Sequence, residues 1–211
     1  RDKAFKDIDS LQPHEIIELL LNFSIIRKNT NPIAHELIEK YGSVSNVMDS
    51  DVSSLMQVQG IGESSASLLV LIPKLCEIYN KSRCAEYSKI PNIAEAQDYF
   101  RILFSTTNHE IIYALCLDKS DKIISLIKLE EGDIDTINVN IGKILVDIAK
   151  FKPTKIYISH NHIVGGKYPS DADITFTDTL KSKLMNLGID LVDHIIVNRN
   201  ETFSFKMSEL L

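Results

Sequence analysis

Through residues 11–79, apolar residues recur at the spacing of an α-helix. Glu15–Asn22 contains one apolar run, and Ile33–Tyr41 repeats apolar residues at i, i+4 and i+8 before Gly42 interrupts the pattern. Positions three or four apart share one helix face, so both segments are predicted helices. Shorter helices are expected over Ser43–Met48, Asp51–Met56 and Ala66–Tyr79. Pro73 lies inside the last of these and is expected to kink or split it.

The segment Lys81–Pro91 is polar, so a domain boundary is expected there. Beyond it, helical and strand periodicities alternate, which is typical of a layered sandwich of strands and helices. Predicted helices are Ile93–Leu103, Ile141–Phe151 and Ser170–Leu187. Predicted strands are Glu110–Leu117, Lys122–Leu129, Lys155–Ser159, Leu191–Val197 and Thr202–Lys206. The sequence therefore predicts an α+β protein, with an all-helical domain over residues 1–88 and a second domain over residues 92–211.

Composition narrows the class of protein. The chain has 211 residues, 44% of them apolar, but no apolar run long enough to span a membrane. No apolar core of a signal peptide follows Arg1–Lys6, so a cytoplasmic location without membrane contact is expected. Three cysteines, none in a C-x-x-C pair, argue against a disulfide framework and a cysteine-based zinc site. Free thiols are therefore expected at Cys76, Cys84 and Cys116.

The charge is spread evenly along the chain. Residues 1–88 carry nine Lys and Arg against twelve Asp and Glu, and residues 89–211 carry fourteen against seventeen, which gives the net charge of −6. Neither half is basic, so electrostatics gives no support for strong sequence-independent binding of nucleic acid.

The segment from His160 to Asp173 carries candidate metal ligands. His160 and His162 alternate with Asn161 at the end of a predicted strand, so both imidazoles can point to one side. A glycine-containing turn then leads to a helix with Asp173 in its first turn. Two histidines and one carboxylate form a typical catalytic zinc set, with a fourth position left for water.

Simpler interpretations exist for each part of this segment. A His-x-His pair on a loop is often incidental, and Ser170 with Asp173 also matches a helix capping box. The two interpretations are compatible, because capping geometry places Asp173 at the helix start, near the histidines.

The spacing from His160-x-His162 through seven residues to Ser170, and two more to Asp173, is similar to the motif of JAMM metalloproteases. Over Ile156–Val197 the sequence further resembles the bacterial RadC family, and the resemblance extends over about the whole chain. It implies a JAB/MPN domain of the cytidine-deaminase-like α/β/α type, holding one Zn²⁺ per chain on these three ligands. The family label associates such proteins with DNA repair.

The resemblance also implies a chemistry, metal-assisted hydrolysis of an amide or isopeptide bond. Glu110 matches the general base on an earlier strand, although an exposed glutamate at a strand start is the simpler interpretation. Ser170 would donate a hydrogen bond to the developing oxyanion. Asn161 is expected to face away from the metal and only to shape the turn. Asp193 and His194 point to opposite sheet faces; either could orient a ligand, but a structural role is favoured.

Two segments depart from the RadC pattern. The family has Pro-Ser-Gly after the His-Asn-His sequence, where this chain has Ile163-Val164-Gly165. A His-Pro-Arg-Glu helix start is replaced here by Asn140-Ile141-Gly142-Lys143. The ligands are retained, so these differences concern substrate contacts.

In the N-terminal half, Gly60, Ile61 and Gly62 match a helix–hairpin–helix signature, with the glycines in the turn and Ile61 in the core. In DNA-binding versions the next helix start holds a phosphate. Glu63 and the acidic balance count against DNA, so DNA contact and a structural or protein-binding role are both kept.

Three functions remain open from the sequence. The first is a zinc metallopeptidase with a peptide or protein substrate. The second is a DNA-binding or nuclease-like module in which the zinc domain is a scaffold, and the third is an interaction domain with a non-catalytic metal. The oligomeric state is also open, a homo-oligomer included.

Overall fold

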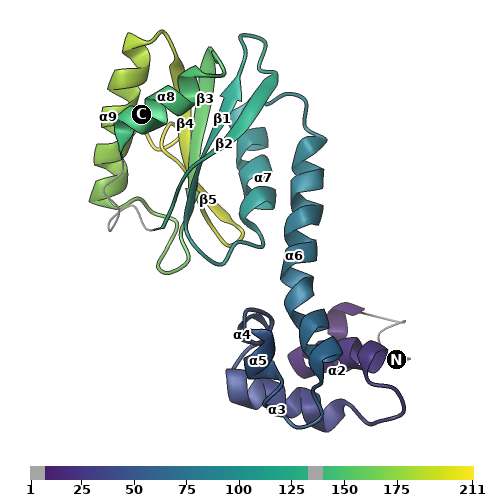
Figure 1. Cartoon of the computed structure of the whole chain (residues 1–211). Helices are drawn as coiled ribbons and strands as arrows, with labels where there is room; N and C mark the ends of the chain where they lie inside the picture. Colours follow the sequence, from purple (N-terminus) through teal and green to yellow (C-terminus); the bar gives the residue numbers. More distant parts are fainter. Residues whose placement is uncertain (1–7, 133–139) are drawn as a thin grey trace. The chain divides into compact units, whose positions relative to one another are not determined.

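The computed structural model describes residues 8–132 and 140–211 (Figure 1). The N-terminal Arg1–Lys6 segment, used above to predict location, lies outside these residues. The chain divides into two compact units, residues 1–78 and 79–211, which are described separately. Among the described residues, no helix combines the length and apolarity that a membrane crossing requires. The predicted α+β class is confirmed, since an all-helical N-terminal region precedes a five-stranded mixed sheet.

The first unit is helical, as predicted. A short 3₁₀ turn, η1 (Ile8–Ser10), is followed by α2 (Pro13–Ser24), α3 (Asn31–Tyr41), α4 (Val44–Met48), α5 (Val52–Leu55) and the first part of α6 (Glu63–Ala85). The two short helices begin at side chains that accept backbone amides. Ser43 accepts from the amide of Asn46, and Asp51 from the amide of Ser54. Their buried faces join one core, which includes Ile17, Leu21, Leu37, Val47, Leu55 and Leu69.

The turn between α5 and α6 contains the candidate DNA-binding residues. Gly60 adopts a left-handed φ of 93°, and a Cβ there would lie 2.8 Å from Cδ1 of Ile33. The left-handed backbone therefore favours glycine, and a larger residue would also require the end of the Ile33 side chain to shift. Ile61 is buried in the helical core, as predicted, and Gly62 is exposed. The helix–hairpin–helix interpretation stays a prediction.

Helix α6 corrects two sequence-based predictions. A kink or a split was predicted at Pro73; the helix is continuous there, so the split is wrong, and the kink stays a prediction. A proline removes one backbone donor, and the turns on either side can keep theirs. The helix also extends to Ala85, past its predicted end at Tyr79 and into the polar segment where the domain boundary was predicted. The end of that segment pairs with the sheet, where Lys89 bridges Lys122.

The second unit is built on a sheet with the strand order β2-β1-β3-β4-β5. Neighbouring strands are antiparallel except β3 and β4, which are parallel. The strands are β1 (Ile111–Leu117), β2 (Ile123–Glu131), β3 (Lys155–Asn161), β4 (Asp190–Asn198) and β5 (Glu201–Ser204). The helices are α7 (Ile93–Phe104), α8 (Ile141–Ala149) and α9 (Asp171–Asn186). All of the predicted strands and helices of this half are present.

Helices cover both faces of this sheet, α7 one face and α8 with α9 the other (Figure 1). Alternate residues of the strands supply the two cores. On β1, Leu115 packs towards α7, whereas Ala114 and Cys116 pack towards α8 and α9. Helix α9 connects the parallel strands β3 and β4, so the end of β3 and the beginning of α9 are close in the chain. The candidate metal ligands lie at this connection.

Candidate metal centre

The two histidines lie at the carboxyl end of β3. His160 pairs in register with Ile112 of β1 and Ile196 of β4, and its side chain is buried. His162 lies just beyond the strand, and the amide of His162 donates to the carbonyl of Val197 at 2.9 Å. This bond continues the extended backbone past the strand end. Both imidazoles therefore point to the same side, as alternation predicts.

Asp173 approaches the histidines from the first turn of α9. Ser170 is the N-cap of this helix: its hydroxyl accepts the amide of Asp173 at 3.2 Å, and the Asp173 carboxylate accepts the amide of Ser170 at 2.8 Å. The predicted capping box is thus present, and it fixes the direction of the carboxylate. Asp173 is buried, so its carboxylate is aimed at the histidines and away from bulk solvent.

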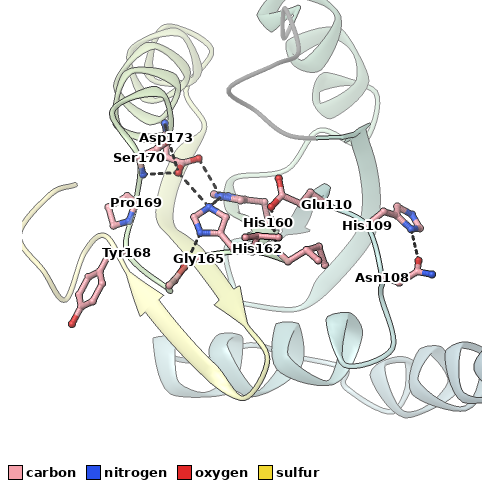
Figure 2. Close-up of a pocket in the computed structure, with 13 residues that line it drawn as sticks. Asn108, His109, Glu110, His160, His162, Gly165, Tyr168, Pro169, Ser170 and Asp173 are labelled. Atoms are coloured by element: carbon pink, nitrogen blue, oxygen red, sulfur yellow. Dashed lines mark hydrogen bonds and ion pairs between the residues drawn. The ribbon is translucent and has the colours of Figure 1, made fainter. Parts of the chain in front are cut away.

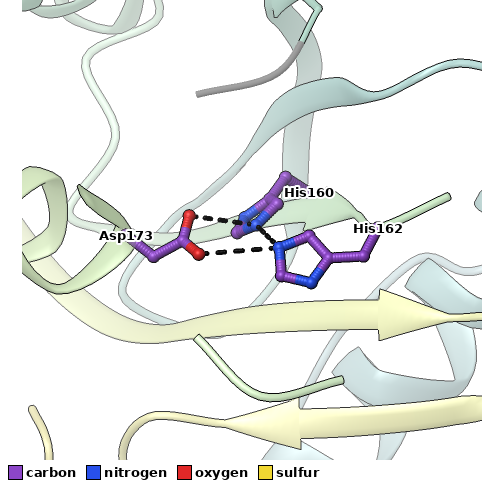
Figure 3. A group of neighbouring side chains, drawn as sticks. All are labelled: His160, His162 and Asp173. Carbon is purple, nitrogen blue, oxygen red and sulfur yellow. Dashed lines mark hydrogen bonds and ion pairs between the residues drawn. The ribbon is translucent and has the colours of Figure 1, made fainter. Parts of the chain in front are cut away.

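The three side chains bring their ligand atoms together (Figure 3). Nε2 of His160 lies 2.9 Å from Nε2 of His162 and 3.1 Å from Oδ1 of Asp173. Nε2 of His162 lies 3.5 Å from Oδ2 of Asp173. Ligand atoms at 2.0–2.2 Å from a tetrahedral zinc ion are separated by roughly 3.3–3.6 Å. The observed spacing needs adjustments of only a few tenths of an ångström, so these residues can hold a metal ion.

The hydrogen-bonding pattern around the triad also favours a cation. Within residues 8–132 and 140–211, Oδ1 of Asp173 is buried without a hydrogen-bond partner. Nδ1 of His162 lies 2.9 Å from the carbonyl of Gly166, and because a carbonyl only accepts, this nitrogen carries the proton. In the neutral ring Nε2 then presents a lone pair towards Asp173. Acceptors that face one another in this way need a positive charge between them.

Two pKa values agree with this interpretation. The Asp173 carboxylate raises the pKa of His162 against the opposing effect of burial, and the carbonyl of Gly166 adds to the rise. Burial by itself raises the pKa of Asp173, but the contacts with His160 and His162 outweigh it and hold this pKa well below its ordinary value. The carboxylate is therefore ionised at neutral pH and attracts a positive charge.

Glu110 lies across the same cavity, of about 570 Å³, whose lining includes all three candidate ligands. In the view of Figure 2, Asp173 and Ser170 lie on one side of the histidines and Glu110 on the other. Glu110 directly precedes β1, and Oε1 of Glu110 accepts the amide of Ile163 at 3.2 Å. The structure thus brings together all five residues that the sequence singled out in this domain. The roles of Glu110 and Ser170 stay predictions.

The hydroxyl of Ser170 donates to Oδ2 of Asp173 at 2.9 Å. A serine hydroxyl has one proton, so donation to an oxyanion requires that this bond be released first. Gly60, Ile61 and Gly62 belong to the other unit and are not among the residues that line this cavity.

Three residues beside the site do more than the sequence predicted. Asn161 faces away from the triad, as expected, but its side chain binds the backbone on both sides of Glu110: Oδ1 accepts the amide of Ile111, and Nδ2 donates to the carbonyl of His109.

His194, for which a structural role was favoured, contacts a candidate ligand directly: its Nε2 lies 2.8 Å from Nδ1 of His160. Burial, followed by the charge of His160, lowers the pKa of His194 well below its ordinary value. Thr177 contacts the other nitrogen of His194.

Thr177 was not predicted from the sequence, although its position in the helix could have indicated it. Thr177 lies four residues after Asp173, on the same face of a helix, so helical spacing could have indicated it. Asp193 turned out to be structural: its carboxylate accepts the hydroxyl of Ser204 and the amide of Lys206.

Comparison with known proteins agrees with this architecture. Residues 90–210 match the family model of the RadC-like JAB domain. A UPF0758 protein of Fusobacterium nucleatum is 32% identical over 213 residues, covering 97% of this chain and 92% of the relative. UPF0758 proteins of Polaromonas sp. and Rhodobacter capsulatus are 26% and 24% identical, covering 95% and 96% of this chain and 89% and 95% of the relatives. The names of these relatives state no activity. The chain belongs to the RadC-like JAB domain family.

Proposed function

We propose that the chain is a zinc-dependent hydrolase that cleaves an amide or isopeptide bond. What carries the proposal is the convergence of two imidazole nitrogens and one carboxylate oxygen, all within 4.8 Å of one another, on the wall of an open cavity. Two histidines and one carboxylate are a frequent ligand set of catalytic zinc, and the set leaves a coordination position for water. Membership of the JAB-domain family is compatible with hydrolase activity, and so is this ligand set.

Zinc in such a site supplies an acidified water and polarises the carbonyl that the water attacks. The protein's own contribution is the arrangement of acid–base groups. Glu110 faces the same cavity from the start of β1 and is ionisable, so it can accept a proton from water and return it to a leaving amine. Ser170 can donate to the developing oxyanion after its hydroxyl releases Asp173.

The rim of the cavity indicates which substrates fit. Val164 and Tyr168 are 86% and 70% exposed, and Ile163 is 40% exposed, although all three are apolar or aromatic. Asn198 holds this loop by donating to the carbonyls of His162 and Gly165. An exposed apolar rim favours substrates with an apolar side chain beside the scissile bond. The Pro-Ser of the RadC pattern is replaced here by Ile163-Val164, so we expect this preference to depend on these two residues.

The first experiment measures metal content. Elemental analysis of freshly purified protein is expected to find about one zinc per chain, in line with a three-ligand site. A double variant, His160→Ala with His162→Ala, should lose it. If neither protein takes up metal, even after incubation with zinc, the proposal is wrong.

The second experiment separates binding from chemistry. Glu110→Gln is expected to keep zinc and to lose hydrolysis of peptide and isopeptide-linked conjugates by about 10²-fold or more, because the proton acceptor is removed. Glu130→Gln is the matched control, since Glu130 contacts Lys143 and is not among the residues that line the cavity. An unchanged rate in the Glu110 variant would exclude the proposed role.

The alternative function, a DNA-binding module, rests on the turn around Gly60. Left-handed Gly60 leads into the start of α6, where backbone amides could face a phosphate. Glu63 in the first turn of α6 opposes this interpretation. A salt series with branched and linear DNA tests it, because phosphate contacts weaken steeply as salt rises. Absence of binding at low salt would remove the alternative.

A further inference from the structure

His194 is the most enclosed ionisable group beside the metal centre. Its side chain is fully buried, stacked on Phe205 with ring centroids 4.6 Å apart and packed edge-on against Phe176. Nε2 of His194 lies 2.8 Å from Nδ1 of His160, and Nδ1 lies 2.6 Å from the hydroxyl of Thr177. The ring thus connects a candidate ligand to the body of helix α9.

The direction of these hydrogen bonds follows from the contact between Thr177 and the backbone of Asp173. The hydroxyl of Thr177 is also 2.6 Å from the backbone carbonyl of Asp173. A carbonyl can only accept, so the single hydroxyl proton of Thr177 points to it. The hydroxyl must therefore accept from His194, which places a proton on Nδ1 of His194.

The remaining assignments follow from charge. Among the described residues, the polar side chains in contact with His194 are those of His160 and Thr177, neither of which is a carboxylate, and aromatic rings pack around it. A charged imidazole in this place would be buried without compensation, so the ring is neutral and Nε2 is an acceptor. An acceptor at this position requires a donor at Nδ1 of His160. In the neutral His160 ring, Nε2 then presents its lone pair to the other two ligands.

We propose that Thr177 and His194 are positioning residues that fix the tautomer of His160 in the form that binds zinc. This inference rests on the proposed zinc site. The chain of bonds starts and ends at ligands, because the carbonyl that anchors it belongs to Asp173. It therefore sets the protonation of one ligand from the backbone of another. Partners of this kind typically change metal affinity by 10- to 100-fold.

The threonine is the informative residue to change. In Thr177→Val the shape is kept, but Nδ1 of His194 loses its acceptor, and the ring can place its proton on Nε2 instead. His160 would then accept at Nδ1 and carry its proton on Nε2, inside the metal site. Thr177→Val is expected to weaken zinc binding by about 10- to 100-fold in chelator competition, whereas Thr177→Ser keeps the hydroxyl and should bind as the unchanged protein does.

Helix α9 offers a matched control. The hydroxyl of Thr175 donates to the carbonyl of Asp171 at 2.9 Å, the same bond between residues four apart, but on an exposed position without a histidine. Thr175→Val is expected to leave zinc affinity unchanged. Equal zinc affinity in the Thr177→Val and unchanged proteins would overturn the proposal, and equal losses in both valine variants would assign the effect to the helix rather than to the chain of bonds.

A measurement without metal separates this inference from the proposed function. ¹⁵N NMR correlation of the His160 ring in zinc-free protein reports which nitrogen is protonated. The expected result is a proton on Nδ1 in the unchanged protein and a population with a proton on Nε2 in Thr177→Val. A proton on Nε2 in the unchanged protein would overturn the inference even if zinc binds. A proton on Nδ1 together with no zinc uptake would refute the zinc site and leave the bonding pattern intact.

Discussion

Replacing Asn161 by alanine tests how the start of β1 is held beside the candidate metal centre. The Asn161 side chain is 3% exposed. Its Oδ1 accepts the amide of Ile111 at 2.8 Å, and its Nδ2 donates to the carbonyl of His109 at 2.9 Å. The side chain therefore provides the hydrogen bonds that a backbone partner would provide further along the strand, on both sides of Glu110.

The expected cost follows from these two bonds. Ile111 is buried, so its amide would lose its partner without access to water, at about 1–3 kcal/mol. The carbonyl of His109 lies in a partly buried contact and adds roughly 1 kcal/mol. Asn161→Ala is thus expected to lower the free energy of unfolding by about 2–4 kcal/mol, a large share of the ordinary 5–15 kcal/mol. Asn161→Asp should be similarly harmful at pH 7, since its second oxygen would face a carbonyl.

Urea denaturation followed by circular dichroism measures this change. Asn92→Ala is the comparison, because Asn92 accepts a single amide at the exposed start of α7, and its loss should cost about 1 kcal/mol. If Asn161→Ala costs no more than Asn92→Ala, the two buried bonds do not hold the strand, and the reasoning is refuted.

Three further predictions concern other residues. Burial raises the pKa of Asp193, so the contribution of this group to stability is largest at low pH and is lost as the pH rises through its folded pKa. Asp193→Asn should therefore gain stability relative to the unchanged protein as the pH rises from about 4. Urea denaturation across pH measures this, and a constant difference in stability would contradict it. Gly60→Ala should cost about 1–3 kcal/mol by thermal unfolding, whereas Gly62→Ala, whose Cβ would meet no described atom within 4 Å, should be nearly neutral; equal effects would refute the strain argument. Burial raises the pKa of Cys84 to about 11 and that of Cys116 to about 12, so neither should react with iodoacetamide at pH 8 until the protein unfolds, and mass spectrometry of labelled native protein would reveal any error.

Element boundaries were predictable where a single residue type decides them. Gly42 adopts a left-handed φ of 83° after α3, and Ser43, Asp51 and Ser170 cap the helices that they precede. The ligand triad was predictable for the same reason, since strand alternation and a capping box are local rules. The path of α6 was not, because tolerance of Pro73 depends on how the turns around it are held.

The role of His194 depends on a feature that sequence alternation cannot reveal. Leu191 packs towards α8 and α9, so strict alternation would place Asp193 on that face and His194 on the other. The register between β3 and β4 shifts at this point, with Ile156 opposite Leu191 but Tyr157 opposite Asp193. After this irregularity, the side chains of β4 point to the face opposite to the one that strict alternation predicts, so His194 lies next to His160.

The two oxygens of the Asp173 carboxylate contact different groups, and this has a kinetic consequence for a metal ion held at the site. Oδ2 closes the first turn of α9 through Ser170, while Oδ1 is directed at His160. Loss of the helix cap would swing both oxygens away together, so fraying of this turn and escape of a bound ion would be one event. Amide exchange at Ser170 would then slow on metal loading, and the lifetime of the ion in the site would be set by how often the end of one helix opens.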